Sequence, residues 1–413
     1  MESEIKRELT DREVLIHTAT LWKNKPIPTN EPEAYPEQKI ECANVGKFHV
    51  IGARVRGKKH KHEGTNSDDW FETGDADKFT ICVVSDGAGS RKFSRIGAKY
   101  ACVGAVADAK KHLTDYIKKH PNIYKNLCRE LTSTSFQSTA ADIAKIARNV
   151  VGLARKNVEI AFDERKHKKE YSELLKRPLE LNDFASTILL TFATFLEDIG
   201  ETFVISCQVG DGMTFAVNKD AKYEDIITLL GDADSGEFSG ETEFLTSSKV
   251  DDISLQKKTK ITRKKIDYIM SMTDGVADDY DPNKIHLLRL YLDLKLNRIL
   301  NANDWEKIIK NMDDKTRYEL SNKIPDPVQY EKENGKSMPI QYSIELMQKY
   351  NVNLKELWEN NQADLAIMSS AITTTNDKNA GTKLFNWLDD YVVRGSFDDR
   401  TLVILENGGK KNG

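Results

Sequence analysis

The sequence places an aspartate at the end of an apolar segment four times, each time beside glycine or another acid. The four are Asp86 in VVSDGAGS, Asp211 in QVGDGM, Asp274 in SMTDGVADD and Asp398 in GSFDDRTLV. A carboxylate at a strand end lies at the rim of a sheet, and a neighbouring glycine lets backbone and ligand approach closely. A single Asp-Gly pair is usually a turn, but four in one kind of context indicate acids gathered on one rim.

Such a cluster of acids needs compensation, because several converging carboxylates repel one another unless cations neutralise them. Hard oxygen ligands favour Mg²⁺ or Mn²⁺ over zinc, and the sequence has no cluster of His or Cys that would favour zinc. The reaction class that most needs such a site is phosphoryl transfer to water.

The apolar segments predict the fold class. Two long helical patterns, at about 96–120 and 139–166, are flanked by strand patterns. Because these strands are apolar without alternation, we expect an α+β fold in which a central β-sandwich is flanked by α-helices. The expected strands are Phe48–Val55, Phe79–Val84, Thr187–Phe195, Phe203–Gln208, Met213–Val217, Tyr268–Met272 and Thr401–Glu406.

Composition narrows the class of protein. A chain of 413 residues is long for one ordinary domain, so one large domain with an insertion, or two domains, are expected. The net charge of −4 argues against a nucleic-acid partner. Five scattered cysteines without a CxxC pair fit a reducing cytosol. With no signal core and no apolar stretch of about 20 residues, we expect a cytoplasmic protein without membrane association.

The domain boundaries follow from changes in pattern. Residues 1–46 are expected to form an N-terminal helix, at 2–23, and a proline-containing linker. Residues 47–284 and 376–407 form the predicted catalytic domain, and 408–413 a tail. Between them, 285–375 reads as an inserted helical subdomain. A role in substrate or partner selection and a purely structural role are weighted equally for it.

The ordered motifs SDGAGSRKFSRIGA, FASTILLTF, FVISCQVGDG, SMTDGVADD and SFDDRTLVIL resemble those of metal-dependent type 2C protein phosphatases, the PPM family. The stretches VRGKKHKHEGTNSDDWFE and SGEFSGETEFLTS resemble a bacterial branch of that family. The resemblance covers about 48–280 and 380–406. It implies serine/threonine phosphatase activity, in which a water that bridges two metal ions attacks the phosphate.

The resemblance also implies a ligand set for two, and up to three, Mg²⁺ or Mn²⁺ ions. Asp86 is expected to bridge two ions, and the carbonyl of Gly87 to bind one of them. The other implied carboxylate ligands are Asp69, Asp274 and Asp398, with Asp211 joining Asp274 at a weaker third site. Asp68 is the alternative to Asp69, and Asp399 is expected to support its neighbour rather than bind metal.

Two positions depart from the family pattern. Many members carry a histidine after the first Asp-Gly as the acid for the leaving group, and this chain carries Ala88. Many also carry a phosphate-binding arginine in the first motif, where this chain has His60. His60 is therefore the candidate for phosphate binding and, with Asp86, for catalysis. Arg56 and Lys59 are alternatives for the phosphate, and a solvated basic loop is an equal one.

The expected substrates are phosphorylated proteins, supplied by a cognate serine/threonine kinase. Two alternatives remain open: a catalytically silent member that binds phosphoproteins or acts as a scaffold, and a small-molecule phosphatase closed by the insertion. Silent members of the family usually lose metal-binding carboxylates. This chain keeps all five that the resemblance implies, which favours activity: Asp69, Asp86, Asp211, Asp274 and Asp398.

Overall fold

The computed structural model describes residues 21–231, 242–280, 284–321, 355, 358–359, 362–371, 379–389 and 397–408. The helix expected at 2–23 lies almost entirely outside the described residues, as does the tail beyond 408. Within the described part of the chain, no helix has both the length and the apolar character needed to cross a membrane.

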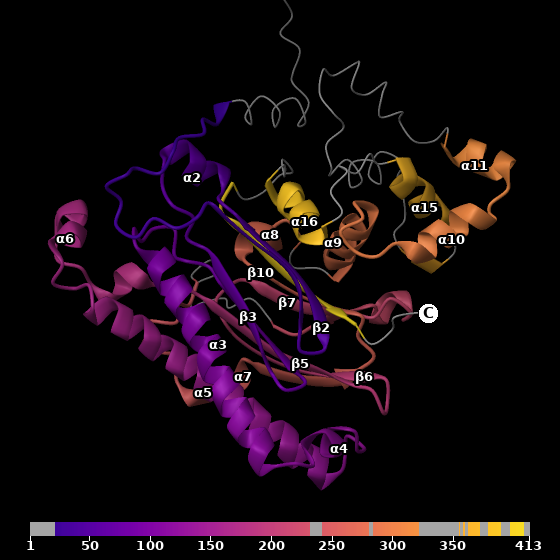
Figure 1. Ribbon diagram of the computed structural model, residues 1–413, viewed down its shortest axis with the longest axis horizontal. Coiled ribbons are helices and arrows are strands. Elements are labelled where there is room, and N and C mark those ends of the chain that lie inside the picture. The colour runs from indigo at the N-terminus through magenta and orange to yellow at the C-terminus, as the bar shows by residue number, and fades with distance from the viewer. Residues whose placement is uncertain are drawn as a thin grey trace, which may run out of the picture.

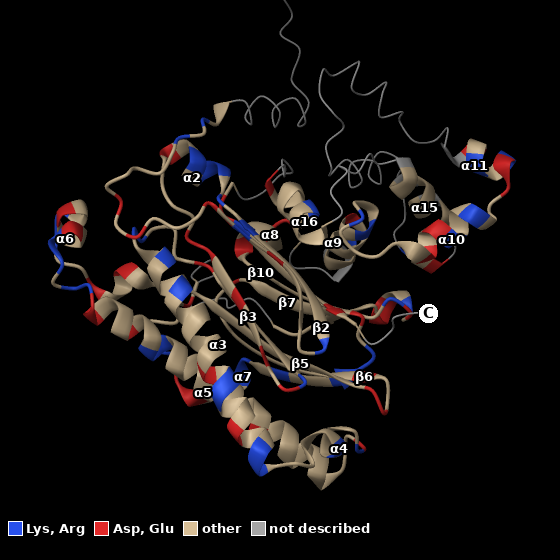
Figure 2. Cartoon of the chain, viewed as in Figure 1, with Lys and Arg blue, Asp and Glu red and all other residues tan. Residues whose placement is uncertain are grey.

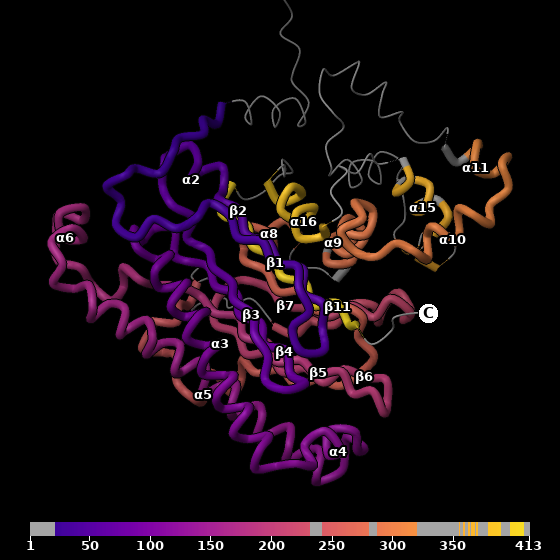
Figure 3. Tube along the Cα trace, in the orientation of Figure 1, coloured from indigo at the N-terminus to yellow at the C-terminus, as the bar shows by residue number. Residues whose placement is uncertain are grey.

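Two antiparallel sheets form the centre of the molecule (Figures 1 and 3). The six-stranded sheet has the order β1-β2-β11-β10-β7-β8, and the five-stranded sheet has the order β3-β4-β5-β6-β9. The first contains β1 (Gln38–Val45), β2 (Phe48–Val55), β11 (Arg400–Asn407), β10 (Tyr268–Met272), β7 (Met213–Val217) and β8 (Ile227–Leu229). The second contains β3 (Trp70–Ala76), β4 (Phe79–Ser85), β5 (Ile188–Leu196), β6 (Glu201–Val209) and β9 (Thr259–Lys264).

Helices cover the outer face of each sheet (Figure 1). Helices α3 (Ser94–Lys119) and α5 (Thr134–Asp163) pack on the five-stranded sheet, and α9 (Lys284–Leu296) and α16 (Ala380–Asp389) on the six-stranded sheet. This arrangement confirms the predicted α+β sandwich. The remaining helices described are α2 (Lys58–Glu63), α4 (Ile123–Leu127), α6 (Lys169–Leu175), α7 (Asp252–Lys257), α8 (Asp274–Ala277), α10 (Asn303–Asn311), α11 (Asp314–Ser321) and α15 (Gln362–Ala371), with short 3₁₀ turns at Leu181–Phe184 and Tyr223–Asp225.

The central strands are apolar on both faces because both faces are buried. In β5, Leu190 and Phe192 pack toward α3 and α5, whereas Leu189 and Ala193 pack between the sheets. Successive side chains of a strand point to opposite faces. A strand covered on both sides therefore has an uninterrupted apolar run, which is the pattern that made these strands predictable.

The strands at the sheet edges differ from the sequence prediction. β1 lies in the predicted linker, β3 follows a segment expected to be a polar loop, and β9 lies in the lysine-rich run after α7. The short β8 was not predicted either. All four are edge strands in the described sheets. Edge strands commonly carry charged residues that prevent pairing with other chains, and this polarity hides them from an apolar pattern search.

The first helix of the predicted insertion lies in the core of the six-stranded sheet. Leu290, Tyr291 and Leu294 are fully buried in the same cluster as Phe215 of β7 and Met270 of β10. Helix α9 contacts both β8 and α15, and its residues from Leu287 to Leu296 are buried except for the partly buried Arg289. The boundary predicted at 285 therefore falls at the start of a core helix.

Candidate metal centre

The strand register brings the predicted acids to one end of the sandwich. The end of β10 pairs with the starts of β7 and β11, since Met272 lies opposite both Met213 and Leu402. In the other sheet, the end of β4 and the end of β6 both lie beside the start of β5. Acids that follow β4, β6 and β10, and those that precede β11, are thus collected at this end.

Three of these acids form a cluster. Asp86 follows β4, Asp211 lies in the turn between β6 and β7, and Asp274 is the first residue of α8. Each offers a carboxylate oxygen, and these oxygens lie within 4.8 Å of one another. Metal–oxygen bonds of 2.0–2.6 Å are typical of Mg²⁺ and Ca²⁺, so one cation can contact all three with small adjustments. Asp211 also accepts a hydrogen bond from the Thr242 hydroxyl.

A fourth acid, Asp69, lies beside the cluster and directly precedes β3. Its side chain is fully buried, and Oδ2 accepts hydrogen bonds from the hydroxyls of Thr273, at 2.8 Å, and Thr401, at 2.7 Å. It lies close enough to Asp86 for the two carboxyl groups to share a proton. The other oxygen, Oδ1, meets no donor among the residues described. Asp69 therefore presents a free oxygen on a rigidly held side chain.

The pKa values of these acids reflect crowding without a cation. Burial, with repulsion from Asp274 and Asp69, raises the pKa of Asp86 well above its usual range. Burial, with repulsion from Asp399, raises that of Asp69 to about 7. Burial, with repulsion from Asp211, raises that of Asp274 to about 8. Full ionisation needs added positive charge, and the all-oxygen donor set fits a hard divalent ion such as Mg²⁺ or Mn²⁺.

The Asp86 loop is fastened to the start of β5. The backbone N–H of Asp86 donates to the Thr187 hydroxyl at 2.9 Å, and the N–H of Thr187 donates to the Asp86 carbonyl at 2.8 Å. Gly87 has no room for a side chain, because a Cβ would lie 2.7 Å from the Asp68 carbonyl oxygen. The loop can therefore approach the acids only with glycine at this position. Binding of metal by the Gly87 carbonyl stays a prediction.

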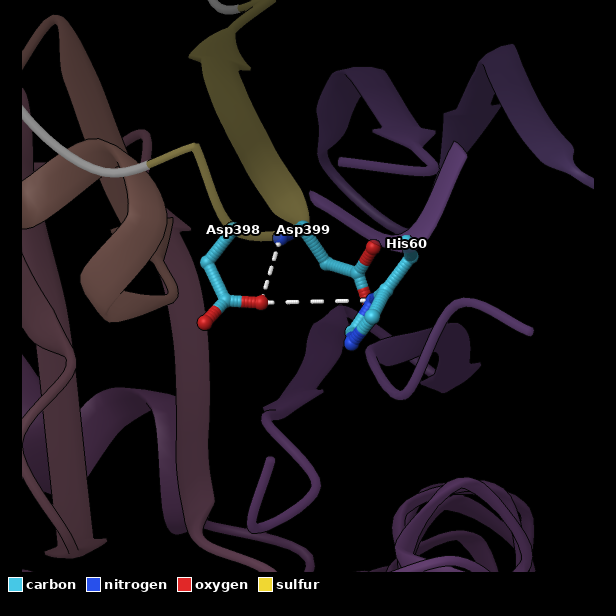
Figure 4. A group of neighbouring side chains, drawn as sticks. All are labelled: His60, Asp398 and Asp399. Carbon is cyan, nitrogen blue, oxygen red and sulfur yellow. Dashed lines mark hydrogen bonds and ion pairs between the residues drawn. The ribbon is translucent and has the colours of Figure 1, made fainter. Parts of the chain in front are cut away.

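A second group of charged side chains lies beside the cluster (Figure 4). Asp398 is partly exposed, and its Oδ1 accepts the N–H of Asp399 at 2.9 Å. Asp399 is buried and accepts the N–H groups of Gly57, at 2.6 Å, and Asp68, at 2.5 Å. The Nδ1 of His60 lies 2.9 Å from Asp399 Oδ2 and 4.0 Å from Asp398 Oδ1. Its Nε2 lies 3.7 Å from Asp68 Oδ2.

These contacts decide the charge state of His60. Burial favours the neutral ring, but the carboxylates of Asp399, Asp68 and Asp398 outweigh it and raise the pKa of His60 to about 10. Burial likewise opposes ionisation of Asp399, and His60 with the backbone donors outweighs it and lowers the pKa of Asp399. The pair is therefore ionised at neutral pH.

The structure gives the two predicted phosphate-binding residues other partners. His60 is only 4% exposed and is enclosed by the acids just described. The buried guanidinium of Arg56 bonds Glu37 at 2.7 Å and the carbonyl oxygens of Lys25 and His60 at 2.9 and 2.8 Å. Neither side chain is offered to an incoming phosphate, because burial and existing partners occupy both. The half-buried Lys59 on α2 stays a candidate for the phosphate, and Figure 2 shows the basic residues of this short helix.

Sequence reasoning missed the hydroxyl groups that orient the acids. Thr273 and Thr401 hold Asp69, Thr187 holds the Asp86 loop, and Thr242 contacts Asp211. A signal was available for two of them, because Thr273 directly precedes Asp274 and Thr401 directly follows the DDR run. Their distance from Asp69 in sequence concealed the contact.

One comparison with known proteins identifies a family. A family model described as Protein phosphatase 2C matches residues 56–311, more than half of the chain. No curated protein matches the sequence.

Three of the similar solved structures are two bacterial phosphatases and RsbX. Serine/threonine phosphatase Stp1 from Staphylococcus aureus is 11% identical, with 90% of this chain and 99% of that chain covered and a TM-score of 0.36. A bacterial serine phosphatase is 11% identical, with 88% and 99% covered and a TM-score of 0.36. RsbX in complex with magnesium is 10% identical, with 89% and 99% covered and a TM-score of 0.31. Because these sequence identities and TM-scores are low, the family assignment rests on the match to the family model. By that match, the chain belongs to the protein phosphatase 2C family.

Proposed function

We propose that this chain is a metal-dependent serine/threonine protein phosphatase. The observation that carries the proposal is the convergence of Asp86, Asp211 and Asp274 within 4.8 Å, with Asp69 held beside them. Four acids drawn from four separate segments have no structural need to meet at one rim. Their mutual repulsion would destabilise the fold unless the site serves to bind cations.

Each acid has a distinct role in the proposed site. Asp86 interacts electrostatically with both Asp69 and Asp274, which makes it the candidate to contact two ions, while Asp398 approaches from the start of β11. Divalent ions bound there would lower the pKa of a water molecule and neutralise the phosphate. Asp211, already bonded to Thr242, suits a weaker third site shared with Asp274. We propose Mg²⁺ or Mn²⁺ as the ions.

The proposed substrates are phosphoserine and phosphothreonine side chains of proteins, with a cognate kinase as the source. The metal acids lie at the exposed end of the sandwich, and Asp398 keeps 36% of its side-chain surface exposed. An open rim suits a protein chain better than a small molecule, which is usually enclosed. A cytoplasmic location is proposed with it, supported by the five free cysteines.

The proposal predicts metal-dependent turnover of phosphopeptides. Purified protein treated with chelator should be inactive on a phosphothreonine peptide, and Mn²⁺ or Mg²⁺ should restore activity. Release of inorganic phosphate measures both. Turnover of p-nitrophenyl phosphate without turnover of any phosphopeptide would favour a small-molecule phosphatase. No turnover of either substrate, despite bound Mn²⁺, would favour a silent phosphoprotein-binding member.

A second prediction concerns the leaving group. Ala88 cannot donate a proton, His60 is enclosed by acids, and His62 accepts the N–H of Lys23 through Nδ1. General acid catalysis is typically worth about 10²–10⁴-fold, so its absence should be visible. Among aryl phosphates, kcat/KM is expected to fall steeply as the leaving phenol becomes more basic. Ala88→His should flatten the slope if the imidazole reaches the leaving oxygen, and a flat slope in the unmodified protein would reveal another acid.

A further inference from the structure

The two Asp-Asp dipeptides of the site divide their acids in the same way. In each dipeptide one acid faces the metal centre: Asp69, which contacts Asp86, and Asp398. The other acid, Asp68 or Asp399, lies closer to His60, at 3.7 and 2.9 Å, although His60 also reaches Asp398 Oδ1 at 4.0 Å. The orientation of Asp68 and Asp399 therefore fixes the orientation of their neighbours along the chain.

Asp399 already joins three segments that are distant in sequence. Its carboxylate accepts the N–H of Gly57, at the start of α2, and the N–H of Asp68, before β3. The N–H of Lys59 also donates to the Phe397 carbonyl at 2.9 Å. A charged acceptor with two backbone donors forms strong, short hydrogen bonds. These hydrogen bonds therefore fix the three segments relative to one another.

The ring of His60 lies near both Asp68 and Asp399, and Figure 4 shows it beside Asp398 and Asp399. Its Nδ1 is 2.9 Å from Asp399, and its Nε2 is 3.7 Å from Asp68. The backbone of His60 is held as well, because its carbonyl accepts from Arg56 at 2.8 Å and from the N–H of Gly64 at 2.9 Å. The ring is thus a fixed group between two buried carboxylates, where a positive charge is the natural compensation.

We propose that His60 is a positioning residue: its ring, 2.9 Å from Asp399 and 3.7 Å from Asp68, links these two acids and so holds their neighbours Asp398 and Asp69 toward the metal centre. The proposal rests on the proposed function only in taking that centre to bind divalent ions. It differs from direct ligation by His60, Asp398 and Asp399, whose ligand atoms also lie within 4.8 Å of one another. Positioning is favoured because both oxygens of Asp399 are already engaged by backbone N–H groups.

The test compares His60→Ala with His62→Ala, a matched histidine on the same helix whose ring packs on Trp22. Thermal unfolding of the chelated protein and calorimetric titration with Mn²⁺ are the readouts, so activity is not needed. His60→Ala should lower the Tm of the metal-free protein by roughly 5–10 °C. It should also weaken Mn²⁺ binding about 10–100-fold without changing the number of ions bound. His62→Ala should change neither.

A double-mutant cycle with Asp399→Asn separates the pair from its surroundings. The losses in Tm from His60→Ala and Asp399→Asn should be less than additive, because each removes the same ion pair.

If His60→Ala does not fold, His60→Gln, which has a side chain of similar size without the charge, takes its place. Loss of one bound ion with unchanged metal-free Tm would overturn the proposal in favour of direct ligation. A lower Tm with unchanged Mn²⁺ affinity would overturn the positioning role. If the unmodified protein binds no Mn²⁺, the proposed function fails, and additive Tm losses would then overturn the ion pair independently.

Discussion

Asp86→Asn is expected to abolish phosphatase activity and, at the same time, to stabilise the metal-free protein. Activity should fall by at least about 10³-fold, because the acid placed to contact two ions loses its charge and several kcal/mol of charge stabilisation with it. Stability should rise because the substitution removes one of several buried carboxyl groups that repel one another. Opposite changes in activity and stability are the signature of a site built for cations.

The stabilising effect should depend on pH. Asp69 and Asp274 have pKa values raised to about 7 and 8, and that of Asp86 is raised well above its usual range. A carboxyl group whose pKa rises on folding stabilises the fold below its ordinary pKa, and this contribution is lost as pH rises through the folded value. The metal-free protein should therefore lose stability between about pH 5 and pH 8. Asp86→Asn should lose less, so its advantage in Tm should be small at pH 5 and larger at pH 8.

Thermal unfolding in chelator at several pH values measures this effect, and phosphate release with Mn²⁺ measures activity. Asp225→Asn is the control, because Asp225 is an exposed aspartate on a surface turn. It should leave both quantities unchanged. Full activity in Asp86→Asn would contradict the assignment of Asp86 to two ions. A fall in metal-free stability at pH 8 would show that its carboxylate has a stabilising partner instead.

Excision of residues 285–375 is expected to prevent folding, rather than to leave a compact phosphatase. Leu290, Tyr291 and Leu294 of α9 are fully buried against the six-stranded sheet, and the ring of Tyr291 lies 5.7 Å from that of Tyr268 on β10. Loss of one buried leucine typically costs about 2–5 kcal/mol, and whole domains are stable by only about 5–15 kcal/mol. Turnover of p-nitrophenyl phosphate and of phosphopeptides should be lost together.

A single substitution tests whether α9 stabilises the fold without excising residues 285–375. Leu290→Ala should lower the Tm markedly, whereas Tyr318→Ala, at a residue 69% exposed on α11, should have little effect. Soluble yield and thermal unfolding are the measurements. If the excised protein folds and keeps turnover of p-nitrophenyl phosphate while losing protein substrates, the segment is a separable subdomain and α9 contributes less than its burial indicates.

The sequence by itself determined the central strands and the two long helices that cover the five-stranded sheet. Strands such as β4 and β5 are buried on both faces, so their sequences are mostly apolar without alternation. Edge strands such as β9 carry lysines and threonines, since one edge faces solvent, and they leave no such run. The place of α9 was equally hidden, because its sequence mixes charged residues with leucines and does not reveal which neighbours bury it.

For the site, the sequence determined which acids end or begin strands, and motif order related them to a family. Only the tertiary structure decided which acid of each dipeptide faces the centre: Asp69 is held by Thr273, at the start of α8, and by Thr401 of β11, whereas Asp68 faces His60. It also placed His60, which sequence made a candidate phosphate ligand, 2.9 Å from the buried Asp399. Residues 60 and 399 are far apart in the chain, and their contact arises from the pairing of β2 with β11. Local sequence fixes the type of side chain, but the pairing of distant strands decides which partners it meets.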